Sequence, residues 1–583
     1  GVDIDLGPTG VLETINGSIA FSAGEFGDLR GDIVARGVGS DVLLSANQSL
    51  RIRGSIEANH DILLSAGSQV VAGQTSVKID GTSFLSSTGG GGRIIVTGQN
   101  DVVFDGVVGT GSTDLALLRL DAVHGNLTIP KTSGRIESDA LIELTGKIVD
   151  VQGVVKSTRT TASTSDYEIT IDASDTARIN GDLQLTGSMK IDADNLLEVY
   201  NTTIAISQPG QRLTLSGGDI RFGKAALDTN GFPVQLGAQV TALDLIEISA
   251  TGAIDIGSGS IVATSGAASR IDASAAEIAV AGSLIAGAHY GADGSGPTFT
   301  GPASTLVLHA RESVTLGGVG IIGGLNEVVG GTAAATGAVS VVVSGGSAPV
   351  SVTIGPDSIL KSVHVGDEPA GTSHLVSVDA DRDIQVFGTI ESMSTGADVT
   401  IWSDELVLVD GLVRAADQLT ISGGDDATDV SISVQAFVYQ TNGLGEVVND
   451  PDGSPIRLAG GTLSTAAGGT ITLNAVEQVL LKGVVGEVVI SGGASVATTH
   501  AVTVLADGTV YVSGSVNAAD LIRFRADGVT IDGDAVIRAR AVGGQVDLRT
   551  TGALLMVAAS AGAEPPLVQA AELVHLAGDV VNL

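Results

Sequence analysis

Apolar and polar residues alternate along residues 376–392, which read VSVDADRDIQVFGTIES. Counted from Val376, the even offsets hold mainly valine, isoleucine, alanine and glycine, and the odd offsets are polar except for Phe387. A period of two over this length is typical of β-strands with one buried and one exposed face. At Arg382 a polar residue falls on an even offset, which indicates a corner. The pattern predicts a strand, a corner, a second strand, a glycine bend and a short third strand.

The same unit recurs along the chain with a small residue at offset 4 and a glycine at offset 12. Residues 42–58, VLLSANQSLRIRGSIEA, carry Ala46 and Gly54 at these offsets. Further copies and close variants occupy residues 169–183, 246–263, 271–286, 306–319, 399–415, 471–485 and 522–539. A repeat of about 20 residues is the sequence signature of a solenoid. We therefore predict an all-β fold, a β-solenoid that forms an elongated rod.

We expect one continuous β-solenoid over residues 1–583, because no linker interrupts the pattern. Loop excursions are predicted where the period breaks, near residues 82–93, 157–166, 288–304, 355–373 and 437–455. The last of these concentrates aromatic and turn residues and is expected to be hairpin-like. Both ends of the sequence lie inside the repeat without a polar cap, so we expect a segment of a longer chain, or ends that stack on other copies.

The composition agrees with a narrow core made of stacked rungs. Hydrophobic residues make up 43% of the chain, but aromatic residues only 3%, with Trp402 as the single tryptophan. Such a core needs medium-sized aliphatic side chains that stack on themselves rather than large rings. The 81 glycines are interpreted as corners that adopt unusual backbone angles.

The charge and the absence of cysteine exclude several classes of function. The formal net charge of −36 repels phosphate backbones, so we expect no nucleic-acid partner. The charge either keeps a long surface soluble or gathers divalent cations. Without cysteine there are neither disulfides nor thiolate metal sites. No run of about 18 apolar residues occurs, and hence no membrane-spanning segment is predicted.

Acidic clusters are the candidates for hydrolytic chemistry, because glycoside hydrolysis requires two carboxylates at a fixed separation. The clusters are Asp379/Asp381/Asp383, Asp192/Asp194, Asp425/Asp426/Asp429 and Asp450/Asp452. The first cluster lies inside an ordinary repeat and has relatives at the same corner of other repeats. Aspartate often bonds its own backbone in turns. We therefore interpret this cluster as a corner device and predict no catalytic residue.

Metal and cofactor sites have little support in the sequence. Asp425, Asp426, Asp450 and Asp452 are candidate calcium ligands, but the segment NDPDG lacks the spacing and the terminal glutamate of a calcium loop. The eight histidines are scattered without a paired spacing. No nucleotide-binding fingerprint and no nucleophile elbow is present. We expect no cofactor, and calcium is the only ion that the sequence leaves open.

The repeat Φ-x-Φ-x-A-x-x-x-Φ-x-Φ-x-G-x-Φ-x-[AS], where Φ is aliphatic, is similar to the repeats of filamentous-haemagglutinin-like exoproteins and other giant bacterial adhesins. The phrases SLRIRGSIEA (49–58) and DILLSAGSQVVAG (61–73) carry the resemblance best, and it covers most of the chain. It implies a right-handed parallel β-helix, an extracellular or bacterial cell-surface location, and a role as a stalk or adhesive rod. The secretion-domain motifs of that family are not recognisable at Gly1.

Three functions stay open on the sequence alone. The first is a non-catalytic structural or adhesive surface fibre. The second is a polysaccharide-active β-helix enzyme, either a lyase or a hydrolase, which would need convergent carboxylates and sugar-stacking rings in one cleft. The third is an architectural lattice or sheath protein. The expected partners are further copies or segments of the same chain, and glycans or proteins on host or neighbouring cells.

Overall fold

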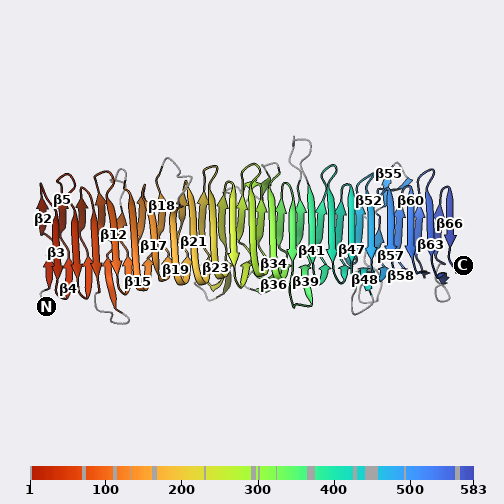
Figure 1. Ribbon diagram of the computed structural model, residues 1–583, viewed down its shortest axis with the longest axis horizontal. Coiled ribbons are helices and arrows are strands. Elements are labelled where there is room, and N and C mark those ends of the chain that lie inside the picture. Colours follow the sequence, from red (N-terminus) through yellow and green to blue (C-terminus); the bar gives the residue numbers. More distant parts are fainter. Residues whose placement is uncertain are drawn as a thin grey trace. The chain divides into compact units, whose positions relative to one another are not determined.

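The computed structural model describes residues 3–67, 74–108, 115–131, 133–159, 167–228, 232–289, 297–299, 303–322, 325–363, 374–424, 430–436, 438–439, 457–486, 488–491, 494–557 and 565–582. The chain divides into two units. Unit 1 contains residues 1–266 and 321–325, and unit 2 contains residues 267–320 and 326–583. Each unit is a stack of parallel strands (Figure 1). Over the ranges above there is no helix, and therefore none that could cross a membrane.

Each turn of the chain contributes a strand to each of three faces. In residues 42–58 these strands are β6 (Val42–Ala46) on the first face, β7 (Ser49–Ile52) on the second and β8 (Ser55–Ala58) on the third. Each strand pairs in parallel and in register with the strand of the same face in the next turn. This is the predicted unit, and the predicted all-β, parallel β-helix architecture is confirmed.

Unit 1 contains β1 to β29. Its first face consists of β3 (Ile19–Ala23), β6, β9 (Ile62–Ala66), β12 (Arg93–Gly98) and β27 (Leu245–Ala250), and its second face of β1 (Ile4–Leu6), β4 (Phe26–Leu29), β7, β10 (Thr75–Ile79), β13 (Asp101–Phe104) and β28 (Ala253–Ile256). Five long strands cross from the first face to the second: β15 (Leu117–Ile129), β17 (Leu141–Val151), β19 (Tyr167–Ile179), β21 (Ser188–Val199) and β23 (Arg212–Phe222). The third face consists of β2 (Val11–Thr14), β5 (Asp32–Ala35), β8, β11 (Phe84–Ser87), β14 (Val107–Val108), β16 (Arg135–Ser138), β18 (Val154–Ser157), β20 (Leu183–Leu185), β22 (Thr202–Ile206), β26 (Ala238–Ala242) and β29 (Ile261–Thr264).

Unit 2 repeats this plan. The long strands β30 (Arg270–Val280) and β34 (Thr305–Leu316) cross two faces, and the first face continues with β38 (Val339–Val343), β41 (Leu375–Ala380), β44 (Asp398–Ser403), β47 (Gln418–Gly423), β52 (Thr470–Ala475), β57 (Ala501–Ala506), β60 (Leu521–Ala526), β63 (Gln545–Thr550) and β66 (Leu573–Ala577). The second face consists of β39 (Val350–Ile354), β42 (Asp383–Val386), β45 (Val407–Val409), β48 (Val430–Val434), β53 (Gln478–Leu481), β58 (Thr509–Val512), β61 (Gly528–Asp532), β64 (Ala553–Val557) and β67 (Val580–Asn582). The third face consists of β31 (Ser283–Ala286), β37 (Thr332–Ala335), β40 (Ile359–Ser362), β43 (Thr389–Ser392), β46 (Leu412–Ala415), β51 (Thr462–Thr465), β54 (Val484–Val485), β59 (Ser515–Ala518), β62 (Val536–Ala539) and β65 (Leu567–Ala570).

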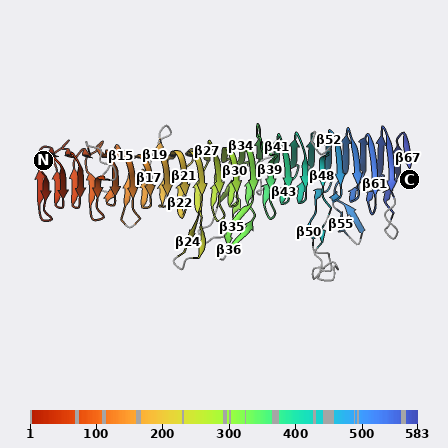
Figure 2. The same ribbon diagram turned by 90° about the horizontal axis from the view of Figure 1, so that it is seen from below.

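Short two-stranded sheets stand apart from the parallel faces. In unit 1, β24 (Lys224–Leu227) pairs antiparallel with β25 (Pro233–Leu236). In unit 2 the antiparallel pairs are β32 (Ala288–His289) with β33 (Thr298–Phe299), β49 (Val438–Tyr439) with β50 (Arg457–Ala459), and β55 (Val488–Ser491) with β56 (Ala494–Ala497). The strands β35 (Gly318–Ile322) and β36 (Leu325–Val329) form another two-stranded sheet. In Figure 2, β50 and β55 project from the same side of unit 2.

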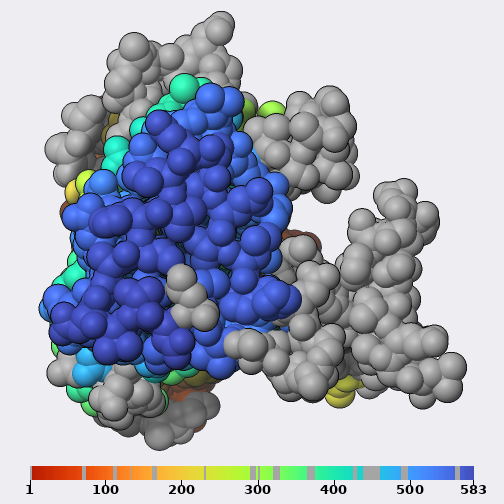
Figure 3. Space-filling view, turned by 90° about the vertical axis from the view of Figure 1, so that its right-hand side faces the viewer, coloured from red at the N-terminus to blue at the C-terminus, as the bar shows by residue number. Residues whose placement is uncertain are grey.

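The core of each unit is made of inward-facing aliphatic side chains that stack from rung to rung. One column in unit 1 contains Val42, Ile62, Ile94, Leu118, Ile142 and Ile169. One column in unit 2 contains Val376, Val399, Leu419, Ile471, Val502 and Ile522. These side chains are buried, and each stabilises its rung by about 1.5–3 kcal/mol before entropy is deducted. Seen from its C-terminal end, unit 2 has side chains across its whole centre (Figure 3).

The core is not purely aliphatic, which differs from the expectation. Phe104, Phe222 and Phe524 are fully buried within the stack. Phe104 lies in register with Ile79, and Phe222 with Ile256. A single ring therefore fits where the neighbouring rungs offer a smaller side chain.

The glycine bend of the repeat has a different cause from the one expected. Gly54 and Gly388 do not adopt positive φ angles. A Cβ atom on Gly54 would lie 2.0 Å from the carbonyl oxygen of Gly31 on the preceding rung, and one on Gly411 would lie 2.1 Å from that of Gly388. Adjacent rungs approach so closely at this corner that only glycine fits.

The structure shortens two predicted excursions. Residues 84–87 form β11, which pairs with β8 and β14 on the third face, so this part of the predicted excursion at 82–93 belongs to the stack. The glycines after residue 87 had suggested a loop, but the preceding FLSS packs as a rung. Within 355–373, residues 359–362 form β40 on the same face. Residues 160–166, 290–296, 364–373 and 440–456, which cover most of the other predicted excursions, lie outside the described residues.

Candidate functional site: a hollow around Trp402

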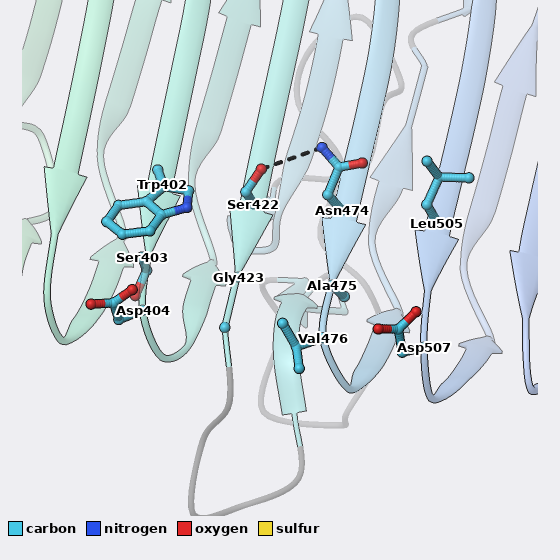
Figure 4. Close-up of a pocket in the computed structure, with 11 residues that line it drawn as sticks. Trp402, Ser403, Asp404, Ser422, Gly423, Asn474, Ala475, Val476, Leu505 and Asp507 are labelled. Atoms are coloured by element: carbon cyan, nitrogen blue, oxygen red, sulfur yellow. Dashed lines mark hydrogen bonds between the residues drawn. The ribbon is translucent and has the colours of Figure 1, made fainter.

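An open hollow of about 380 Å³ lies on the outer side of the first face of unit 2. It spans the strands β44, β47, β52 and β57 (Figure 4). We call it the Trp402 hollow, and it is lined by Trp402, Ser403, Asp404, Ser422, Gly423, Gly424, Asn474, Ala475, Val476, Leu505 and Asp507. Its volume falls within the range of about 300–1,000 Å³ that is usual for ligand pockets.

The register of the sheet brings the main lining residues together. Trp402 pairs with Ser422, Ser422 with Asn474, and Asn474 with Leu505 on consecutive rungs. Because side chains alternate between the two sides of a strand, all four point away from the core. With about 4.8 Å between rungs, Trp402 and Leu505 are separated by about 14 Å along the stack.

Three large apolar side chains are exposed inside this hollow. Trp402 is 42% exposed, Val476 52% and Leu505 41%. The outward positions of the first face are otherwise mostly polar or small along these rungs. Exposed apolar groups that gather in one concave place mark a binding surface more often than isolated ones do.

Polar groups accompany the apolar ones. The Asn474 side-chain amide donates a hydrogen bond to the Ser422 hydroxyl across 3.3 Å, and the amide oxygen points toward the Leu505 side (Figure 4). A second outward column lies two residues before this one on each strand. Over six rungs it consists only of hydroxyl side chains, namely Ser340, Ser377, Thr400, Thr420, Thr472 and Thr503. The hollow thus combines an aromatic ring and an oriented amide, and a row of hydroxyls runs beside it.

The two carboxylates of the hollow lie at opposite ends of it. Asp404 follows Trp402 by two residues, and Asp507 follows Leu505 by two residues. The three intervening rung steps place them about 14 Å apart. Paired glycosidase carboxylates are separated by about 5–9.5 Å, so these two cannot act together on one glycosidic bond.

The sequence candidates Asp379, Asp381 and Asp383 lie one rung before Trp402. Asp379 is in register with Trp402, and its pKa is raised because burial disfavours the charged form and because Asp381 and Asp404 add negative charge nearby. Asp381 accepts a hydrogen bond from the Gly345 backbone amide at 2.5 Å, and Asp383 accepts one from that of Leu406 at 3.3 Å.

Both aspartates thus accept a hydrogen bond from the backbone of a neighbouring rung, a contact that the sequence did not predict. The reason is the short distance between rungs, which places the amide of the adjacent turn within reach of a corner side chain. Asp381 and Asp383 each connect two rungs.

The other acidic candidates form no paired site among the described residues. Asp192 accepts hydrogen bonds from Lys190 at 2.9 Å and from Ser216 at 2.8 Å. Burial opposes its ionisation, but these two bonds outweigh burial and lower the pKa of Asp192. The calcium candidates Asp425, Asp426, Asp450 and Asp452, and also Asp429, lie outside the described residues.

One further group in unit 1 has the residue types of a metal site. In the part of the chain that the structure describes, Asp41, His60 and Asp61 are the only three such residues whose ligand atoms lie within 4.8 Å of one another. Asp41 Oδ1 already accepts hydrogen bonds from the Asp61 amide and from His60 Nδ1, both at 3.0 Å. Asp61 accepts from the Arg93 backbone amide at 2.9 Å and from its Nη2 at 2.6 Å. The guanidinium supplies the positive charge that an ion would bring, and the group connects rungs.

The repeat pattern of the sequence does not reveal the Trp402 hollow. A signal was present, because Trp402 and Leu505 are large apolar residues at outward offsets, each two residues after an outward threonine. However, the alternation alone cannot show that Ser422 and Asn474, 52 residues apart, lie side by side. The interruption of the repeat between them hides the register.

Comparisons with known proteins identify no relative of the chain. No protein-family model, no curated protein and no solved structure matches it. Its function is therefore inferred from the geometry of its strand faces and of the Trp402 hollow.

Proposed function

We propose that the chain is a non-catalytic segment of a secreted or cell-surface bacterial fibre that serves as a rigid stalk or adhesive rod. Its architecture supports a mechanical role, because each unit is a stack in which every rung contacts its neighbours on three faces. Such a stack resists bending and exposes a long outer surface. The resemblance of the repeat to those of giant bacterial adhesins supports the same role.

The single observation that carries the adhesive part of the proposal is the Trp402 hollow. It presents an exposed ring and two exposed aliphatic side chains on a strand face whose outward positions are mostly polar or small along these rungs. Large apolar side chains that are exposed singly are common on protein surfaces, but three that gather in one hollow are typical of a binding surface. The partners we propose are glycans or proteins on host or neighbouring cells, together with other copies of the same fibre.

An enzymatic function has less support at this hollow. Catalysis of glycoside hydrolysis would require two carboxylates closer than Asp404 and Asp507. Lyase chemistry would require a base next to the sugar and a cation that neutralises its acid group. Asp404 or Asp507 could act as the base, but none of the described residues that line the hollow is a cation.

Two assays test the proposal. Antibodies against the chain should label the exterior of the source cells, and beads coated with the purified chain should bind to such cells or to the surfaces they colonise. In parallel, the chain is incubated with neutral and acidic polysaccharides, and new reducing ends and unsaturated products are measured. Surface labelling and bead adhesion without product release are expected. Product release, or an exclusively internal location, would refute the proposal.

A further inference from the structure

We infer that the Trp402 hollow binds an extended, uncharged glycan chain that runs along the stack across β44, β47, β52 and β57. This inference rests on the adhesive function proposed above and specifies its ligand. It follows from three properties of the hollow, namely its stacking surface, its charge and the spacing of its polar groups.

The stacking surface is the indole of Trp402. The apolar C–H face of a pyranose ring packs on an aromatic plane, while its hydroxyls remain free at the rim. Tryptophan suits this role because it joins a large apolar body to a polar N–H group. Val476 and Leu505 extend the apolar floor, so that further rings of the same chain also cover exposed carbon.

The polar groups of the hollow match the hydroxyls of a sugar. Asn474 is oriented by its bond to Ser422, so that one amide orientation is favoured before a ligand binds. The neighbouring column offers half-buried hydroxyls at Thr400, Thr420 and Thr472, which both donate and accept. Few directed polar contacts around an apolar floor are typical of small-molecule sites.

The charge of the hollow selects among glycans. Asp404 and Asp507 line its ends, and Asp379 lies one rung beyond Trp402. None of the described lining residues is positively charged, and the chain carries a net charge of −36. A uronic-acid or sulfated polymer would be repelled at both ends of the hollow, and no described lining residue would attract it. Arg525 lies in register one rung beyond Leu505, but its guanidinium is paired with Asp547. An uncharged glycan avoids this penalty, and its hydroxyls can donate hydrogen bonds to the two carboxylates.

The spacing of the rungs favours a chain over a single sugar. The outward groups repeat every 4.8 Å or so, and an extended β-linked glycan advances by a similar length per sugar. Successive sugars therefore meet equivalent positions on successive rungs, from Trp402 to Leu505. A basic, extended peptide is the competing ligand, because it would also satisfy the carboxylates.

Trp402 is the only tryptophan of the chain, so its fluorescence reports on this hollow alone. The purified chain is titrated with cellohexaose, hexa-N-acetylchitohexaose and mannohexaose, with hexagalacturonate as the anionic comparison and a lysine-rich, proline-rich peptide as the competing ligand. We expect a saturable change in emission with at least one neutral oligosaccharide and none with hexagalacturonate.

Variants are compared by affinity electrophoresis in gels that contain the matching neutral polysaccharide, because this readout does not need tryptophan. Trp402→Ala should weaken binding by about tenfold or more, and Trp402→Phe should restore most of it. Asn474→Ala should weaken binding by a smaller factor. Phe232→Ala removes an aromatic side chain that is 62% exposed in unit 1 and should leave binding unchanged. Circular dichroism checks that each variant is folded.

Several outcomes would overturn the inference: no neutral oligosaccharide binds, Trp402→Ala binds as well as the original chain, hexagalacturonate binds more tightly, or only the peptide binds through Trp402.

The failure of the glycan site is distinguishable from that of the fibre function. If beads that carry Trp402→Ala still adhere to cells, the adhesive fibre stands and the glycan site is wrong. If the chain cleaves the glycan that it binds, the non-catalytic function is wrong and the site stands.

Discussion

The carboxylate of Asp547 lies 2.6 Å from the guanidinium of Arg525 on the preceding rung of unit 2. On its other side, Asp547 Oδ1 lies 2.9 Å from Arg549 Nε and 2.9 Å from His575 Nδ1. One carboxylate thus holds together basic side chains from β60, β63 and β66. Burial opposes its ionisation, but the bonds from Arg525, His575 and Arg549 outweigh burial and hold the pKa of Asp547 well below its usual value of 3.8.

Replacement of Asp547 by asparagine should destabilise this part of unit 2 in a pH-dependent manner. A depressed pKa in the folded state means that the carboxylate stabilises the fold above pH 3.8, and that this contribution is lost as the pH falls toward the folded-state pKa. The thermal midpoint of Asp547→Asn should therefore lie below that of the original chain at pH 5, and the gap should narrow at pH 3. A gap of the same size at both values would contradict the assigned ion pairs.

Asp379 should have the opposite effect on stability. Its pKa is raised by burial and by Asp381 and Asp404, so its contribution to stability is complete below pH 3.8 and is lost as the pH rises through the raised value. We expect Asp379→Asn to raise the thermal midpoint at pH 7 and to leave it nearly unchanged at pH 3. Circular dichroism melts at the two pH values test this. A variant that is less stable than the original chain at pH 7 would show that Asp379 makes a stabilising contact.

The assignment of inner and outer faces is tested at β42 and β43. Ile384 is fully buried and stacks between Val352 and Val407, whereas Thr389 points outward on the next strand. Ile384→Asp should lower the free energy of unfolding by about 2–5 kcal/mol or more, because it removes a buried aliphatic side chain and buries a carboxylate. Thr389→Asp should change stability by less than about 0.5 kcal/mol.

In a stack whose rungs contact only their neighbours, the damage at Ile384 should stay local. Limited proteolysis and hydrogen exchange should show loss of protection near residues 376–392 and little change near residues 42–58. If Thr389→Asp were the more harmful change, the assignment of the two faces would be wrong.

Much of the fold could be predicted because each rung must bury one side of its strands and expose the other, which gives the same alternation every time. Val42 and Leu44 point inward and Leu43 outward because of simple alternation, and the strands β6, β7 and β8 follow the predicted unit closely. The strand β11 was missed because the glycine-rich segment after it resembles a loop, although Leu85 is fully buried. The local sequence pattern therefore predicts the strands of a regular rung well. It predicts them poorly where the corner of the rung is irregular.

The functional surface could not be predicted in the same way. Asn474 lies beside Ser422 only because the chain returns to the same face after a long interruption of the repeat. Register between turns of variable length depends on backbone pairing, which a pattern of period two does not encode. The single tryptophan was visible in the sequence, but its neighbours on other rungs were not.

The repeated glycine of the corner gives a last prediction, because its role differs from the usual one of glycine. The extended corner at Gly54 requires no positive φ angle, but a Cβ atom there would lie 2.0 Å from the carbonyl oxygen of Gly31 and 2.6 Å from its carbon. Both atoms belong to the backbone, so the collision can be relieved only if two hydrogen-bonded rungs move apart. We expect Gly54→Ala to cost about 1–3 kcal/mol and to accelerate hydrogen exchange in β7 and β8.

Gly7 is the matched control for this prediction. It also belongs to unit 1 and has no positive φ angle, but no atom lies within 4 Å of the position of its Cβ. Gly7→Ala should leave hydrogen exchange unchanged or slow it slightly, because alanine reduces the conformational entropy of the unfolded chain. Equal effects of the two substitutions would mean that backbone conformation, and not the approach of adjacent rungs, requires glycine at the corner.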